Sequence, residues 1–157
     1  MPAPRHRDDE FPQPDKVVIV LTVTDSPETL SDLTRILERS NWRIRSARSC
    51  QEALGFLKAH PLPVIVCERK LPDGNWADLY TCLDSLSEPP TLIVTSPHAD
   101  QGLWAEVLNL GGYDVLPQPF ERAEVVRVVS LAWLRWKERH MRLQSRLHPE
   151  QELTAAV

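Results

Sequence analysis

Several apolar runs in this chain end at a polar residue that could do chemistry. These polar residues are Thr24, Asp25, Glu68, Thr95 and Gln118. The carboxylate of Asp25 could bind a cation or cap a helix, and the hydroxyl of Thr95 could contact an anion or satisfy backbone groups. Whether they form one site depends on whether the fold brings the ends of these runs together.

The residue types that commonly build enzyme and metal sites are scattered. The histidines and cysteines are His6, His60, His98, His140, His148, Cys50, Cys67 and Cys82. No two histidines stand four apart, none has a neighbouring nucleophile, and the cysteines lack CxxC spacing. We therefore expect three buried free thiols, no catalytic residue, no metal site and no cofactor, so the chain is not expected to be an enzyme.

Five short apolar runs predict strands, and an amphipathic segment follows each of them. The strands are expected at about 16–23, 42–47, 63–67, 91–95 and 113–116. Ser26 before Pro27, and Ser49 three residues before Glu52, are typical of helix starts, and Gly111 is typical of a helix end.

This alternation predicts a doubly wound α/β fold with a five-stranded parallel sheet covered on both faces. In such sheets, ligands bind beyond the carboxyl ends of the strands, where the strand order reverses. Residues 24–25, 68, 95 and 118 are therefore predicted to share one site.

The residues at those strand ends resemble the receiver domains of bacterial response regulators. The segments that carry the resemblance are VLTVTDSPE, VIVCERKLPDGNW, TLIVTS and GGYDVLPQPF, within about residues 16–137. The resemblance implies a flavodoxin-like fold, a role in two-component or phosphorelay signal transduction, and a cis peptide bond before Pro119. In that family an acidic pair, a phosphoacceptor aspartate, a Ser or Thr and a lysine surround the phosphorylation site.

The chain departs from the family pattern at most of these positions. Thr24 stands where the first paired acid is expected, which leaves Asp25 for at most a weak cation. Glu68 takes the phosphoacceptor position, Gln118 replaces the lysine, and Val115 replaces the switching aromatic residue. A longer carboxylate is misplaced for in-line attack, and a neutral amide cannot compensate charge on a phosphoryl group. The resemblance thus implies a pseudo-receiver with a degenerate phosphorylation pocket.

Two alternatives concern the acidic residues. Glu68 could mimic a phosphorylated aspartate, but we favour drift because Gln118 and Val115, which would read a mimic, have also changed. The chain could also be a receiver that still accepts a phosphoryl group on Glu68 or Asp73. We expect instead a phosphorylation-independent signalling module that acts by protein–protein interaction.

A long C-terminal helix is predicted from about Glu121 to at least Arg146, apolar over more than one face. Its proposed interaction surface is Val129, Trp133 and Trp136, which predicts a homodimer or another protein partner. Its basic residues are Arg135, Lys137, Arg139, Arg142 and Arg146. A solvated face is favoured over an anionic partner, and with a net charge of -4 nucleic-acid binding by this helix is the weaker alternative.

Three segments are predicted: a flexible tail at 1–15, a receiver-like domain at 16–137, and a helical extension and tail at 138–157. Hydrophobic residues make up 42% and charged residues 25%, a balance typical of globular proteins. No apolar run approaches the ~20 residues that span a bilayer, and the N-terminus does not resemble a signal peptide. We expect a cytoplasmic protein without a membrane partner.

Overall fold

The computed structural model describes residues 18–38 and 42–147 of the chain. Five strands form one parallel sheet in the order β2-β1-β3-β6-β7. The strands are β1 (Val18–Val23), β2 (Trp42–Ala47), β3 (Val64–Glu68), β6 (Thr91–Ser96) and β7 (Asp114–Pro117). The predicted doubly wound α/β fold is confirmed, and the predicted tails lie outside the described residues.

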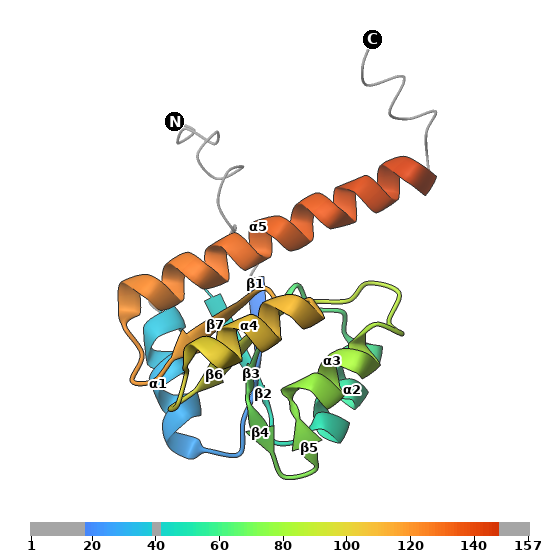
Figure 1. Ribbon diagram of the computed structural model, residues 1–157. Helices are drawn as coiled ribbons and strands as arrows, with labels where there is room; N and C mark the ends of the chain where they lie inside the picture. The colour runs from blue at the N-terminus through green and yellow to red at the C-terminus, as the bar shows by residue number, and fades with distance from the viewer. Residues whose placement is uncertain (1–17, 39–41, 148–157) are drawn as a thin grey trace, which may run out of the picture.

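Helices cover both faces of the sheet (Figure 1). They are α1 (Pro27–Glu38), α2 (Cys50–Ala59), α3 (Trp76–Leu83), α4 (Gln101–Leu110) and α5 (Arg122–Leu147). One core cluster joins the sheet to α2, α3 and α4, and a second joins it to α1 and α5. None of the helices in the described ranges has the length and apolar character needed to cross a membrane.

The helix ends follow the predicted local signals. Ser26 Oγ accepts a hydrogen bond from the Thr29 amide at the start of α1, and Ser49 Oγ accepts from the Glu52 amide at the start of α2. The Glu52 carboxylate accepts from the amide of Arg48 instead of Ser49, so the predicted capping box is only half formed. Helix α4 ends at Gly111, whose φ of 108° lies in the left-handed region that favours glycine.

A small hairpin between β3 and α3 was not predicted. Its strands are β4 (Lys70–Leu71) and β5 (Gly74–Asn75), which pair antiparallel. The Asn75 side chain caps α3 and exchanges hydrogen bonds with Asp78 in a full capping box. The hairpin therefore fixes how the chain passes from the end of β3 into the next helix.

One prediction about burial is wrong. Cys82 lies on the outer side of α3 and is exposed, whereas Cys50 and Cys67 are buried as expected. On α4, Leu108 is exposed because the core-facing positions of that helix are Leu103 and Val107.

Candidate functional site

The carboxyl ends of β1, β3, β6 and β7 bring the predicted pocket residues to one edge of the sheet. Strand β1 pairs with both β2 and β3, so the strand order reverses between β1 and β3. Thr24 and Asp25 follow β1, Glu68 ends β3, Thr95 lies near the end of β6, and Gln118 follows β7. The structure thus places these residues at the topological switch point, where ligands bind in this fold class.

The first two pocket residues, Thr24 and Glu68, are hydrogen-bonded to each other. Thr24 Oγ1 donates to Glu68 Oε1 at 3.0 Å and accepts from the amide of Ser26 at 3.0 Å. Thr24 is 3% exposed, so this arrangement is largely shielded from water. One oxygen of the Glu68 carboxylate is therefore already held by a neighbouring side chain.

Two other pocket residues, Thr95 and Gln118, are also hydrogen-bonded to each other. Thr95 Oγ1 donates to the carbonyl oxygen of Leu116 at 2.8 Å and accepts from Gln118 Nε2 at 3.1 Å. Thr95 is fully buried, and its hydroxyl satisfies a backbone carbonyl, which is one of the two roles that the sequence left open. The peptide bond between Gln118 and Pro119 is cis, which confirms that prediction.

Asp25 stands apart from these bonds. It is exposed, and α1 is capped by Ser26 rather than by Asp25. Among the described residues no group of three or more His, Cys, Asp or Glu side chains could hold a metal ion. Mg²⁺ prefers several hard oxygen ligands in octahedral geometry. One exposed carboxylate beside a hydrogen-bonded glutamate does not fit that ion.

The position of the switching aromatic residue is filled by a core side chain. Val115 is 1% exposed and belongs to the core cluster under α2, α3 and α4. A buried valine has no polar group and no alternative exposed position within this packing. The residue type that would swing between inside and outside is therefore absent here.

Asp73 is occupied elsewhere. Its carboxylate accepts hydrogen bonds from the amides of Cys50 and Gln51, at 2.8 and 3.0 Å, at the start of α2. These backbone bonds hold the pKa of Asp73 below its usual value. Burial raises the pKa of the Cys50 thiol to about 11, with the Asp73 charge adding to the effect. Neither feature was visible in the sequence, because no local pattern connects the hairpin to α2.

The structure contradicts one residue of the predicted interaction surface on α5. Val129 is fully buried in the core against the sheet, so its assignment to a surface is wrong. Trp133 packs against the same core, edge-on to Trp42 with ring centroids 6.4 Å apart. Trp136 is half-buried and stacks on His140. Other parts of the same chain therefore cover most of the apolar surface of Val129, Trp133 and Trp136 that a partner was expected to cover.

The exposed apolar residues of α5 are different ones. Leu131, Leu134 and Met141 are 42%, 46% and 58% exposed. Since successive helical residues turn by ~100°, these three lie on one side of the helix. We call them the outer α5 face. Their three- and seven-residue spacing is the sequence signal that could have identified them.

A model of the response regulator receiver domain family matches residues 20–130. The chain is similar to the response regulator GtcR of Aneurinibacillus migulanus, at 26% identity over 107 residues, which cover 68% of this chain and 44% of that protein. It is also similar to the phosphoglycerate transport system transcriptional regulatory protein PgtA of Salmonella typhimurium, at 20% identity, over 71% of this chain and 27% of that protein. The chain thus spans less than half the length of either relative.

Solved structures share the fold. The beryllofluoride-activated NtrC4 receiver domain dimer matches with a TM-score of 0.70 and 25% identity, over 75% of this chain and 98% of that chain. The signal receiver domain of an HD domain-containing protein from Pseudomonas fluorescens Pf-5 matches with a TM-score of 0.72 and 21% identity, over 80% and 93%.

Proposed function

Because the chain belongs to the response regulator receiver domain family, we propose that it is a pseudo-receiver that signals by protein–protein interaction without being phosphorylated. The observation that carries the proposal is the 3.0 Å hydrogen bond between Thr24 Oγ1 and Glu68 Oε1. The carboxylate at the acceptor position is bound to the residue that replaces an acidic cation ligand.

Two further observations support it. Transfer of a phosphoryl group requires positive charge around the transferred oxygens. Gln118 is neutral and donates its amide N–H to Thr95, so it leaves that hydroxyl bonded on both sides. Asp73, the other candidate acceptor, is engaged by two backbone amides at the start of α2.

The test is intact mass spectrometry after incubation with acetyl phosphate and Mg²⁺. We expect no phosphoryl adduct on the wild-type chain, while an active receiver domain treated in parallel is modified. An adduct that disappears in Glu68→Gln or in Asp73→Asn would overturn the proposal and identify the acceptor.

The partner surface that we propose is the outer α5 face, and the partner is a second copy of this chain. Three large apolar side chains between 42% and 58% exposed form one side of a helix, which is typical of an interaction surface. The NtrC4 receiver, which is similar to this chain, is a dimer. Two-fold pairing is the commonest way to close such a surface.

Sedimentation of Leu134→Glu tests the dimer. We expect the wild type to be dimeric at ~100 μM, where even a micromolar interface is mostly occupied, and the variant to be monomeric with an unchanged circular dichroism spectrum. Leu143→Glu is the matched control, because Leu143 is also exposed but lies on another side of α5. A monomeric wild type would reject the homodimer.

Nucleic-acid binding by α5 is the less favoured function. Lys137 lies over the Trp133 ring at 5.2 Å, and Arg135 lies over the Tyr113 ring at 5.8 Å. These contacts direct two of its cations onto the protein's own aromatic rings. A salt-dependent mobility shift with random DNA, lost in Arg142→Gln, would favour this alternative.

A further inference from the structure

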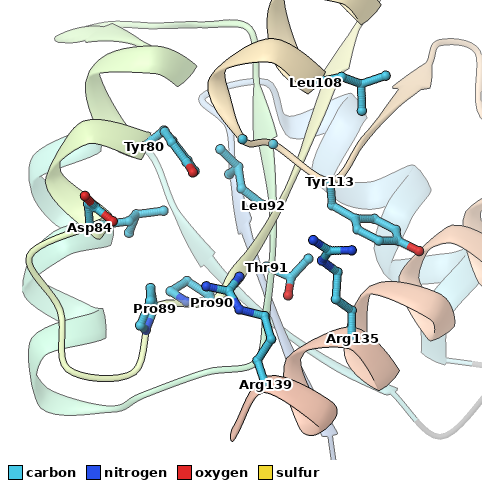
Figure 2. Close-up of a pocket in the computed structure, with 13 residues that line it drawn as sticks. Tyr80, Asp84, Pro89, Pro90, Thr91, Leu92, Leu108, Tyr113, Arg135 and Arg139 are labelled. Atoms are coloured by element: carbon cyan, nitrogen blue, oxygen red, sulfur yellow. The ribbon is translucent and has the colours of Figure 1, made fainter. Parts of the chain in front are cut away.

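A second pocket lies at the opposite end of the sheet from the candidate site. It has a volume of about 300 Å³ and is enclosed by α3, the loop before β6, the end of α4 and α5 (Figure 2). It opens beside Thr91, the first residue of β6, whereas the candidate site includes Thr95. Four residues of strand place the two about 13 Å apart.

The pocket carries two arginines from successive turns of α5. Arg135 and Arg139 both line it. Figure 2 shows the Arg139 guanidinium beside Pro90, and the Arg135 guanidinium lies 5.8 Å from the centre of the Tyr113 ring, which also lines the pocket. Among the described residues neither arginine has a carboxylate within ion-pair distance. Asp84 is the one acidic side chain in the described lining, so the pocket has a net positive charge.

A buried hydroxyl in the same pocket lacks a partner. Within the described ranges, the buried side-chain atoms without a hydrogen bond are Thr22 Oγ1 and Thr91 Oγ1. Thr91 is 4% exposed and lines the pocket, and in Figure 2 it lies between the side chains of Arg135 and Arg139. Buried hydroxyls are normally hydrogen-bonded, so an unpaired one beside two cations points to an absent acceptor.

The rest of the wall is apolar and well fixed. Pro89 and Pro90 form one side, and Tyr80 and Leu92 contribute to another. The Tyr80 hydroxyl packs against Gly111, where an added Cβ would come within 2.1 Å of it. Glycine at this helix end therefore leaves room for the tyrosine that bounds the pocket.

We propose that this pocket binds a small phosphate monoester with a flat apolar part, of the size of a nucleoside monophosphate. The phosphate lies between Arg135 and Arg139, because a guanidinium presents paired N–H donors that match phosphate oxygens. Rotation of the Thr91 side chain brings its hydroxyl, which is enclosed in the free chain, to one phosphate oxygen, and the flat part lies against Pro89 and Pro90. A volume of about 300 Å³ is at the lower end of ligand pockets, which suits a mononucleotide better than a dinucleotide.

Isothermal titration with adenosine 5′-monophosphate tests the proposal. We expect saturable binding with a dissociation constant on the order of 10–100 μM, as for an average ligand of ~20 non-hydrogen atoms. Adenosine and inorganic phosphate should each bind at least tenfold more weakly. Equal binding of adenosine would overturn the anion site, and equal binding of phosphate would overturn the monoester class.

Variants assign the site to these residues. Arg135→Gln with Arg139→Gln should weaken binding more than tenfold, whereas Arg142→Gln, on the same helix outside the pocket lining, should leave it unchanged. Thr91→Val should weaken binding several-fold without lowering the thermal midpoint of the free protein, because its hydroxyl has no partner to lose. No saturable heat up to millimolar ligand, or equal affinity of the double variant, would reject the site.

Discussion

Strand β6 carries a buried threonine at each end, and the surroundings of the two differ. The Thr95 hydroxyl donates to Leu116 and accepts from Gln118, while the Thr91 hydroxyl has no partner, and Thr91 lines the pocket that Arg135 and Arg139 also line. The edge where this family carries out its chemistry has polar groups that satisfy one another. At the opposite edge the Thr91 hydroxyl has no such partner.

The largest expected effect comes from restoring the family's residue types in the candidate site, at the carboxyl end of β6, which we call the satisfied end. Changing Thr24→Asp, Glu68→Asp and Gln118→Lys together restores the acid pair, the acceptor and the cation of the family pattern. We expect acetyl phosphate to form a phosphoryl adduct on this variant and none on the wild type, since a positional error of ~1 Å alone costs about 100-fold in rate. Intact mass against time measures it, and Mg²⁺ should raise the thermal midpoint of this variant alone.

Removing one hydroxyl at the satisfied end should weaken the fold. Thr95→Val leaves the buried carbonyl of Leu116 without its side-chain donor and removes the acceptor of Gln118 Nε2. We expect a loss of about 1–3 kcal/mol in the free energy of unfolding, the usual effect of an unsatisfied buried group. Urea unfolding followed by circular dichroism gives the value. An unchanged midpoint would mean that these bonds contribute little.

Thr91→Val, the matched change at the start of β6, should not lower the free energy of unfolding. Thr91→Val replaces an unpaired buried hydroxyl with a methyl group of similar shape. We expect the free energy of unfolding to stay the same or to rise by up to ~1 kcal/mol. The same urea titration compares both variants. A loss as large as that of Thr95→Val would show that both ends are equally satisfied in solution.

The smallest effect concerns Asp73, which also lies near the satisfied edge. Its pKa is lowered in the folded chain by the amides of Cys50 and Gln51, so its stabilisation is present above the unfolded value near 4. That stabilisation is lost as the pH falls through the folded pKa. Asp73→Asn should therefore unfold at a slightly lower temperature at pH 7 and show a shallower decline below pH 4. Thermal melts from pH 7 to pH 2 test this.

The fold could be predicted from the sequence because its signals are local. Runs of apolar residues, caps at Ser26 and Ser49, and the glycine at 111 each act over a few neighbouring residues. The membership of the candidate site could also be predicted, because parallel strands bring their carboxyl ends to one edge. The hydrogen bonds of these residues could not be predicted, since Thr24 and Glu68 are 44 positions apart in the chain.

The errors on α5 have a geometric cause. The sequence shows an apolar helix but not how far the sheet and α1 reach along it, so Val129 and Trp133 were assigned to the surface. The second pocket was missed for a similar reason. It joins Thr91 to arginines more than forty positions later, and neither arginine belongs to a recognisable motif.

Helix α5 runs for 26 residues without a glycine or proline, the usual sources of a kink. Its first half lies on the sheet, and its next turns still contact the domain, since Arg139 lines the second pocket and His140 Nδ1 lies 3.5 Å from Glu88 Oε1. Figure 1 shows the last turns extending past the body of the domain. The stretch 141–147 is about 10 Å long at the helical rise per residue. It behaves as a short lever arm, because a tilt of ~10° at its base displaces its far end by roughly 2 Å. A change of packing where α5 meets the domain is therefore expected to move this end relative to a neighbouring chain.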